Sequence, residues 1–268
     1  MWSINGCPFV SGIRHSNNTI SKAARRLIVK IGTRKMTSIE LFGVVDTLSA
    51  ESEQYKSGIT AASESLKDAY EIFNSVSYAT KEDWKKQADS GNDIVYSKSI
   101  KNGKMFSLSY EPKLDCESVF QDTWTGVEDL TKWNPDYEFS HRIKILSEHT
   151  DVVHNCLKDM MVVKGRELVV MRMWRKLGDA YYLSGRSFET VDIPESKNKV
   201  RAFLHFGAGR FQPHPTDPTK CKVDLVMCID LKGWIPALVI NVGMGKMMLQ
   251  DAELNKKRYA EIRKAKSA

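Results

Sequence analysis

The chain has 268 residues, which is enough for one large domain with an extension or for two small domains. An apolar fraction of 42% and a charged fraction of 27% exclude a disordered chain, and no apolar run approaches the roughly 18 residues that a membrane span needs. The five cysteines are odd in number and never spaced C-x-x-C, so we expect no disulfide framework, no metal site and a reducing compartment.

The net charge of +7 is concentrated at the N-terminus. Residues 1–39 contain seven basic residues and no acidic residue, because the first acid is Glu40. Subtracting these seven from the 40 basic residues of the chain leaves 33, which match the 33 acidic residues. The body is therefore formally neutral. We expect no nucleic-acid binding, since a domain that follows phosphates carries its basic residues on the fold itself.

Residues 1–46 form a basic extension in front of the predicted domain, which takes residues 47–268. Within the extension, four apolar residues fall at i, i+4, i+7 and i+11 and share one helix face: Ile20, Ala24, Leu27 and Ile31. This amphipathic, arginine-bearing and acid-poor segment has the profile of a mitochondrial transit peptide, and the alternative is a disordered basic tail. It lacks the apolar core of a secretory signal. We therefore expect a mitochondrial or cytoplasmic protein, peripheral at membranes and not secreted.

The first predicted elements are two helices and a hairpin. A helix is expected to begin near Ser49, a favourable N-cap residue. The apolar residues that follow recur at helical steps and predict one buried stripe: Tyr55, Ile59, Leu66, Tyr70 and Phe73. A short second helix is expected over 81–88. Strands are expected over 94–97 and 104–110, because the Asn102-Gly103 step before the second strand is a strong hairpin signal.

A further helix and a series of strands follow. The helix is predicted over 115–131, where Phe120, Trp124 and Val127 share one face. Six strands are predicted after it, at 139–146, 151–158, 167–176, 179–186, 199–206 and 222–231. Because proline fits the first turn of a helix, a long helix is predicted from Pro236 to about residue 264. The pattern predicts an α+β fold, in which a helix lies across a long antiparallel sheet.

Several motifs occur in order and together resemble one family. The tightest is Ile229-Asp-Leu-Lys-Gly-Trp-Ile-Pro236 with Ile240-Asn241 after it, and the next is Lys132-Trp133-Asn134-Pro135. Further matches are Trp84-Lys85-Lys86, Ser97-Lys98, Gly103-Lys104-x-Phe106, Gly185, Pro194, Glu195, Lys197, Arg201 and Ala202. From about Tyr55 to its end, the chain resembles a START domain, closest to the sterol-carrying steroidogenic-regulator branch.

The resemblance implies a helix-grip fold, in which a curved sheet and the C-terminal helix enclose a hydrophobic tunnel for one lipid. A loop beside the helix gates this tunnel. The resemblance also implies a carrier rather than an enzyme, with no cofactor. The expected ligand is cholesterol or another sterol, moved between membranes by a monomer that contacts membrane surfaces transiently. Sterol-binding members have an arginine as a nearly lone polar group in the cavity, and the resemblance places it at Arg172.

Arg172 shares one face of its predicted strand with Val170 and Trp174. A buried cation needs a partner, and breaking such a pair costs several kcal/mol. We interpret Arg172 as the group that meets the ligand's hydroxyl, directly or through water. The alternative is an exposed arginine, with Met171 and Met173 facing the core instead.

The partner of this arginine departs from the family pattern. In the family it is a glutamate one strand earlier, and an ungapped count from Arg172 puts Val153 at that position. Asp151 lies two residues away, on the same face of a regular strand, and is the candidate substitute. If Asp151 does not substitute, the arginine is satisfied by water or by a different polar headgroup.

The predicted C-terminal helix presents one apolar face, made of Leu238, Val242, Gly245, Leu249 and Ala252. Together with Leu183 on the strand 179–186, the first four complete the expected lipid-contacting set. Gly243 and Gly245 each cost roughly 1 kcal/mol relative to alanine inside a helix. Either they leave room for a ligand and favour local opening, or they are tolerated in ordinary packing. Basic residues near the helix end either attract anionic headgroups or form a solvated tail.

Three other functions are weighed against a sterol carrier. An enzyme is disfavoured because no G-x-S-x-G, H-E-x-x-H, P-loop or full G-x-G-x-x-G motif is present. A phospholipid or ceramide carrier on the same fold would differ in the lipid that co-purifies. A lipid sensor that acts through a protein partner would bind lipid without moving it between vesicles.

Overall fold

The computed structural model describes residues 36–160, 163–235 and 237–267. Its main element is a sheet with the strand order β3, β4, β5, β12, β11, β9, β8, β7 and β6, antiparallel throughout, with the short β10 added in parallel to β8. The strands are β3 (Lys85–Ser90), β4 (Asp93–Ile100), β5 (Gly103–Tyr110), β6 (Tyr137–Ser147), β7 (Thr150–Leu157), β8 (Arg166–Leu177), β9 (Ala180–Ser187), β10 (Val200–Arg201), β11 (Phe203–His214) and β12 (Asp217–Asp230). This arrangement confirms the predicted α+β class.

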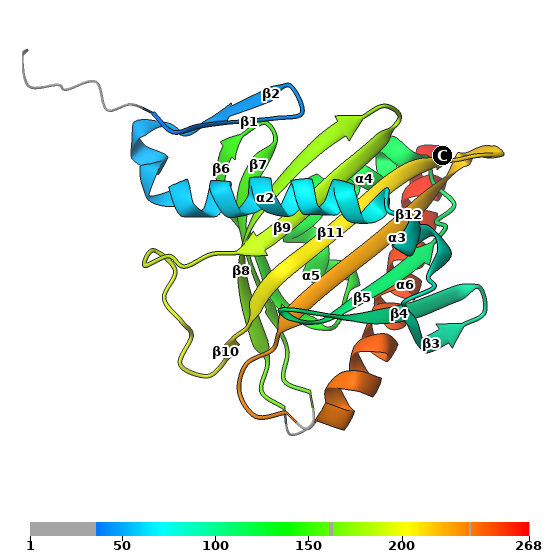
Figure 1. The fold of residues 1–268 in the computed structure, drawn as a ribbon. Coiled ribbons are helices and arrows are strands. Elements are labelled where there is room, and N and C mark those ends of the chain that lie inside the picture. The colour runs from blue at the N-terminus through cyan, green and yellow to red at the C-terminus, as the bar shows by residue number, and fades with distance from the viewer. Residues whose placement is uncertain (1–35, 161–162, 236, 268) are drawn as a thin grey trace, which may run out of the picture. The chain divides into compact units, whose positions relative to one another are not determined.

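Helices cover both faces of the sheet. The short helix η1 (Ala50–Tyr55) leads into α2 (Lys56–Phe73), which crosses one face, and α3 (Val76–Thr80) follows it (Figure 1). The other face carries α4 (Cys116–Thr125), η2 (Gly126–Asp129), α5 (Leu130–Trp133) and the long α6 (Ala237–Ser267). We call the face under α2 the outer face and the face under α4 and α6 the inner face.

Strand alternation assigns side chains to the two faces. Along β12, Val226 and Cys228 belong to the core under α2, whereas Val223, Leu225 and Met227 belong to the cluster that includes α4 and α6. Because side chains alternate along a strand, a sheet covered on both sides has apolar residues at successive positions. The two faces therefore carry different apolar clusters, and a third, smaller cluster of Val127, Val153 and Val170 lies on the inner face.

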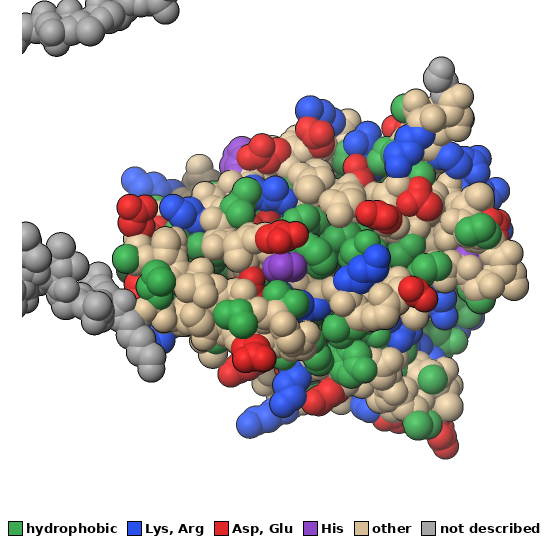
Figure 2. All heavy atoms as spheres, turned by 90° about the horizontal axis from the view of Figure 1, so that it is seen from above, with side chains coloured by type: hydrophobic (Ala, Val, Ile, Leu, Met, Phe, Trp, Pro, Cys, Tyr) green, Lys and Arg blue, Asp and Glu red, His purple; other side chains and the backbone are tan. Residues whose placement is uncertain are grey.

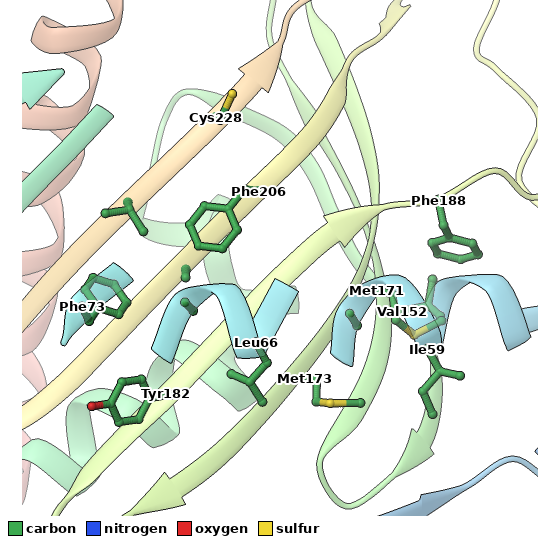
Figure 3. Packing of buried hydrophobic residues seen from close by; sticks show 14 of the residues in the cluster. Ile59, Leu66, Phe73, Val152, Met171, Met173, Tyr182, Phe188, Phe206 and Cys228 are labelled. Atoms are coloured by element: carbon green, nitrogen blue, oxygen red, sulfur yellow. The ribbon is translucent and has the colours of Figure 1, made fainter. Parts of the chain in front are cut away.

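The outer face is a filled core. Ile59, Leu66 and Phe73 lie in a row along one face of α2 (Figure 3). They face side chains of the sheet, including Met171 and Met173. Ile59, Leu66 and the two methionines are fully buried. The predicted stripe on this helix is confirmed at four of its five positions: Tyr55, Ile59, Leu66 and Phe73, while Tyr70 is exposed.

A hairpin of β1 (Ser38–Leu41) and β2 (Val44–Thr47) extends the outer side of the molecule. It is fixed by Arg175, which is 1% exposed and donates to Asp46 Oδ2 at 2.5 Å and to the carbonyl of Leu41 at 3.1 Å. The sequence pattern does not predict these strands, which fall inside the predicted extension of residues 1–46 except for Thr47. The predicted amphipathic helix and transit peptide lie outside the described residues.

The prediction of a helix over residues 81–88 is wrong. The helix is α3 instead, whose N-cap Ser75 accepts a hydrogen bond from the Tyr78 backbone N–H at 3.1 Å. Lys81 ends it in the left-handed conformation, with φ of 57°. Residues 85–90 form β3, which pairs with β4. Pairing with a neighbouring strand therefore outweighs the local helix preference of this segment.

Two other predicted elements have different bounds. The helix predicted over 115–131 is three short pieces, because α4 ends at Thr125 and Gly126 begins a 3-10 turn. The strand predicted over 199–206 becomes β10 and β11, and β11 continues to His214. Gly207 and Gly209 hide this continuation in the sequence, because glycine has low strand propensity.

The surface view shows a mixed distribution of charge. On the face seen from above, acidic and basic side chains are interspersed among small apolar patches (Figure 2). Among the described residues, no helix is both long and apolar enough to cross a membrane.

Candidate functional site

The inner face is apolar but incompletely covered. Leu225, Met227 and Ile229 point to this side from β12, and all three keep part of their surface accessible. Leu168 on β8 and Leu204 on β11 are also only partly buried. Apolar side chains that a covering helix leaves partly accessible are typical of a ligand-binding wall.

Glycines leave two positions of this apolar wall without a side chain. Gly185 on β9 pairs with Gly207 on β11 in the middle of the inner face. A Cβ at Gly185 would lie 2.7 Å from the Val170 side chain, and one at Gly207 would lie 2.9 Å from the Leu204 side chain. Val170 and Leu204 therefore lie over the glycines, and no side chain projects from these two positions onto the inner face.

Aromatic residues close the far end of the inner face. Phe120 of α4 stacks on Tyr181 with ring centroids 4.2 Å apart and meets Trp174 edge-on at 4.9 Å. Trp174 also contacts Trp124, with centroids 6.4 Å apart. These rings fill the region under α4, and Arg172 lies at the edge of this region, two residues before Trp174 on β8.

Arg172 stands at this boundary within a cluster of ion pairs. Its Nε donates to Asp151 Oδ1 at 2.9 Å, and its Nη2 donates to Asp151 Oδ2 at 2.6 Å. Its remaining bonds reach the carbonyls of Thr123 and Trp124 at the end of α4, at 3.3 and 2.9 Å. Arg142 of β6 brings a second guanidinium, with its Nε 2.9 Å from Asp151 Oδ2.

The cluster is balanced by a helix end and an aromatic ring. Two guanidinium groups share one fully buried carboxylate, and both also donate to the Trp124 carbonyl. The C-terminus of a helix carries a partial negative charge, which offsets the excess positive charge. Both guanidinium groups also lie over the Trp124 ring, at 4.5 Å for Arg172 and 5.3 Å for Arg142.

A pocket of about 450 Å³ opens at the other end of the inner face. It lies between α6, the segment joining β7 to β8, and the segment joining β12 to α6. Its apolar lining includes Leu157, Met160, Val163, Leu231, Ile235, Ile240, Met244 and Met247. Arg166, the first residue of β8, donates to the carbonyls of Leu231 and Lys232 at 3.1 Å each, which fixes the segment before α6.

The matched motif at 132–135 holds α6 in place. Asn134 is 1% exposed, and its Nδ2 donates to Asp251 Oδ1 of α6 at 2.9 Å. Gln250 Nε2 donates to Asp136 Oδ2 at 3.1 Å. Burial raises the pKa of Asp251 to about 6, against the effect of its hydrogen bonds from Asn134 and Asn255. The attachment of α6 therefore depends on the ionisation of a buried group.

The predicted site residues divide into three groups. Arg172 and Asp151 are ion-paired, as the spacing predicts, and Val153, Val170 and Trp174 lie on the same inner face. Leu183 and Leu249 are buried in the inner cluster near the covering helices. The side chains of Leu238 and Val242 are outside the described part of the chain. Their role in lipid contact stays a prediction.

The glycines of α6 were expected either to leave room for a ligand or to be tolerated in ordinary packing, and each alternative holds for one of them. A Cβ at Gly245 would lie 3.0 Å from the Ala88 Cβ, so this glycine allows α6 to pack closely on β3. Gly243 lines the pocket and has nothing within 4 Å of a Cβ position. Gly243 therefore leaves room, while Gly245 serves packing.

Two residues of the candidate site are absent from the sequence-based predictions. Arg142 belongs to the polar cluster and Arg166 to the pocket wall. Counting across the β6–β7 hairpin does not find Arg142, because Asp151 pairs with Ile145 whereas Arg142 pairs with Val153, and a register shift lies between these two pairs. Arg166 carries no sequence signal either, because its partners are backbone carbonyls.

Comparison with known proteins agrees with this architecture. The START domain family model matches residues 64–264. Steroidogenic acute regulatory-like protein 1 of Caenorhabditis elegans is 34% identical over 231 residues, covering 84% of this chain and 88% of that protein. The mitochondrial steroidogenic acute regulatory protein of Homo sapiens is 27% identical over 186 residues, covering 67% and 65%.

Solved structures show the same fold. Human StAR-related lipid transfer protein 5 superimposes with a TM-score of 0.70 at 15% identity, covering 78% of this chain and 99% of that one. Human STARD10 gives a TM-score of 0.62 at 19% identity, covering 69% and 76%. Since the family model spans most of the described sheet and the whole of α4 and α5, the chain belongs to the START domain family of lipid-binding proteins.

Proposed function

We propose that the chain binds one sterol on the inner face of its sheet and carries it between membranes, including delivery to mitochondria. The observation that carries the choice of a sterol is the polar cluster around Arg172, which has almost no hydrogen-bonding capacity left. The mitochondrial destination rests on the relatives, which are named mitochondrial steroidogenic acute regulatory proteins.

The distance between pocket and cluster suits one lipid. Arg166 lines the pocket and Arg172 lies six residues further along the same strand. At about 3.3 Å per residue this corresponds to about 20 Å. One leaflet of a bilayer is about 15 Å of hydrocarbon, so a lipid that spans a leaflet fits between the two points. The side chains that face it, Leu168 and Val170, are apolar.

The polar end suits a single hydroxyl. A guanidinium has five N–H groups, and four of those of Arg172 are used by Asp151, Thr123 and Trp124 among the described residues. One N–H on Nη1 is left for a ligand oxygen. A phosphate or sugar headgroup would bury several acceptors against one donor, and each unsatisfied group costs about 1–3 kcal/mol. A sterol buries only one such acceptor, its hydroxyl oxygen.

The rim of the pocket is suited to transient membrane contact. Trp234 is 89% exposed and Met160 is 49% exposed, on the two segments that border the pocket. The pocket lining has four basic residues, Lys158, Lys164, Arg166 and Lys246, against two acidic ones, Asp136 and Asp159. Exposed apolar side chains beside an excess of lysine favour the interface of an anionic membrane.

The lysines also give a reason to test a second candidate ligand. A phospholipid could place its phosphate at the pocket mouth among these lysines, with its chains on the inner face. Native mass spectrometry of the purified protein with its co-purified lipid distinguishes the two. A sterol adduct is expected, and a phospholipid adduct alone would contradict the sterol proposal while keeping the family assignment.

Transfer and anchoring are tested together with vesicles. The protein is expected to move a fluorescent sterol from donor vesicles to anionic acceptor vesicles, and Trp234→Ser is expected to slow this transfer several-fold.

Arg172→Lys keeps the charge beside Asp151 but loses the free N–H. Its sterol affinity is expected to be three- to tenfold weaker, which corresponds to the loss of about one hydrogen bond.

Arg210→Lys is the matched control for Arg172→Lys. Arg210 has the same exposed fraction as Arg172 and pairs with a buried aspartate on the outer face. Its replacement is expected to leave sterol affinity unchanged. Equal losses in both variants would show that Arg172 acts only through general stability, and the proposed contact with the ligand would then be wrong.

A further inference from the structure

Arg166 is a buried cation without a carboxylate partner in the described part of the chain. It is 7% exposed and lines the pocket beside α6. Its Nε and Nη2 donate to the backbone carbonyls of Leu231 and Lys232 at 3.1 Å each, and its Nη1 donates to the carbonyl of Lys164. Every other described arginine that is at least partly buried pairs with a carboxylate: Arg142, Arg172, Arg175, Arg186, Arg201, Arg210 and Arg258.

An unpaired buried guanidinium leaves this part of the pocket short of negative charge. Burying a charge is costly unless it is paired, and carbonyl dipoles offset only part of that cost. Burial lowers the pKa of Arg166. A guanidinium nevertheless stays protonated in proteins, so the position keeps its positive charge and favours an anion beside it.

The guanidinium has donors left for such an anion. Three of the five N–H groups of Arg166 are used by the three carbonyls, which leaves one on Nη1 and one on Nη2. Two N–H groups of a planar fork suit two oxygens of one phosphate group. The carbonyls also hold the fork in place, so that little side-chain freedom is lost when an anion binds.

The charged residues around Arg166 act in the same direction. Lys164 and Lys246 line the same pocket, are exposed, and form no ion pair with any described residue. The two acidic residues of the lining are already engaged. Asp159 pairs with Lys199 at 2.9 Å, and Asp136 accepts a hydrogen bond from a side chain of α6. The free charges at the pocket are therefore positive.

We propose that Arg166, with Lys164 and Lys246 beside it, binds the phosphate of an anionic phospholipid in the membrane that the protein contacts. A free phosphate ion has the same chemistry, but the surroundings favour a headgroup. Trp234 is 89% exposed and Met160 is 49% exposed, on the two segments that border the pocket. Large apolar side chains of this kind insert at the membrane interface, where the phosphates of the lipids lie.

This inference rests on the membrane contact of the proposed function, but it does not depend on the sterol. Arg166 and Arg172 are at opposite ends of the inner face, so the headgroup site and the polar cluster of the sterol site are separate. One lipid is carried in the protein, and the other stays in the membrane and holds the pocket against it.

The test measures binding of the full-length chain to sterol-free vesicles of phosphatidylcholine with or without phosphatidylglycerol. Arg166→Gln is expected to weaken binding to the phosphatidylglycerol vesicles at least about tenfold, since charge-assisted hydrogen bonds are lost. Arg263→Gln is the matched control. It removes the same charge from α6, 17 residues after Lys246 and about 25 Å along the helix axis, and is expected to change binding less than about twofold. Residues 1–35 are present in every variant and contribute equally.

A second variant covers the structural role of Arg166, whose replacement also removes its bonds to the three carbonyls. Lys164→Gln combined with Lys246→Gln leaves those bonds intact and is expected to weaken binding to the same vesicles about fivefold or more. Equal losses in Arg166→Gln and Arg263→Gln, or unchanged binding of the double variant, would overturn the proposal. Neither vesicle contains sterol, so a failure of sterol binding leaves these results as they are.

A soluble probe separates the headgroup from the free ion. Dihexanoyl phosphatidylglycerol below its micellar concentration is titrated into the nitrogen-15-labelled wild type, and the Nε–H signal of Arg166 is followed by nuclear magnetic resonance. A saturable shift is expected, and inorganic phosphate at the same concentrations is expected to shift the signal much less. No shift with the lipid would reduce Arg166 to a structural role, and equal effects of both probes would identify a site for free phosphate instead of a headgroup.

Discussion

On the outer face of the sheet, Arg210 donates to Asp224 at 2.7 Å and to the carbonyl of Phe73 at the end of α2. On the inner face, Arg172 donates to Asp151 at 2.6 Å and to the carbonyl of Trp124 near the end of α4. In both cases the arginine side chain is 12% exposed and the carboxylate is at most 1% exposed. Each guanidinium also lies over an aromatic ring of the covering helix, at 5.1 and 4.5 Å.

The two arginines differ in what surrounds them. Beside Arg210 the outer face is solid, and Val226 on the neighbouring strand is 1% exposed. Beyond Arg172 the inner face continues into partly accessible residues, among them Leu204 and Ile229, and ends at the pocket. The same ion-pair arrangement is therefore surrounded by close packing on one face and by an incompletely covered wall on the other. An arginine-aspartate pair alone does not distinguish the two faces; the cover over the residues next to it does.

Breaking each ion pair is expected to have the largest effect. Arg210→Met leaves Asp224 buried without its cation and is expected to lower the free energy of unfolding by about 3–5 kcal/mol. Arg172→Met is expected to cost roughly half as much, because Arg142 still lies 2.9 Å from Asp151. Urea unfolding of the two variants measures the difference. Adding Arg142→Met to Arg172→Met is expected to restore the full cost, and a double variant no less stable than Arg172→Met would contradict the shared-carboxylate interpretation.

Truncating a leucine on each face compares their packing directly. Leu66→Ala in α2 removes a fully buried side chain and is expected to cost about 2–5 kcal/mol, since it leaves a cavity in a filled core. Leu225→Ala on the inner face is expected to cost roughly 1 kcal/mol, because its side chain already borders accessible space. The comparison is made by urea unfolding without lipid. Equal costs would mean that the inner face is packed as tightly as the outer one.

The attachment of α6 is expected to depend on pH. Burial raises the pKa of Asp251 to about 6, above its unfolded value of 3.8. The folded state then holds this proton more tightly, so the contribution to stability is complete below about pH 4 and is lost as pH rises through 6. Relative to Asp251→Asn, the wild type is expected to lose on the order of 2 kcal/mol between pH 4 and pH 7. Unfolding free energies measured across this range give the difference curve, in which other carboxylates such as Glu167 cancel. Parallel curves would exclude Asp251 as the source.

Most of the fold could be predicted from the sequence because the strongest signals are local. The Asn102-Gly103 turn, the proline at the start of the C-terminal helix and the apolar stripe on α2 each determine one element without reference to the rest. The prediction for residues 81–88 was wrong because that segment is a strand only through its pairing with β4. The β1–β2 hairpin was missed for a similar reason, since the contact of Asp46 with Arg175 joins residues 129 positions apart.

The site could be predicted only in part. The spacing of Arg172 and Asp151 on adjacent strands is a two-residue regularity, and it correctly indicates their pairing. Whether that pair faces a solid core or an open wall depends on how closely a helix lies over the strand, which no sequence period encodes. Arg210 and Asp224 have the same alternation along their strands and lie on the other face. Likewise, Gly243 and Gly245 are indistinguishable in sequence, and only the position of β3 separates them.

A glycine in each covering helix gives the smallest and most direct comparison of the two faces. A Cβ at Gly58 in α2 would lie 2.6 Å from Met171 Cε and 3.0 Å from the Phe188 ring, whereas a Cβ at Gly243 in α6 would contact nothing within 4 Å. Alanine gains about 1 kcal/mol over glycine inside a helix, and overpacking a core costs about 1–3 kcal/mol. Gly243→Ala is therefore expected to raise the free energy of unfolding by up to about 1 kcal/mol, and Gly58→Ala to lower it by about that amount. Opposite signs in urea unfolding would establish that α6 covers space where α2 covers side chains, and a destabilising Gly243→Ala would mean that the pocket beside α6 is filled in the lipid-free protein.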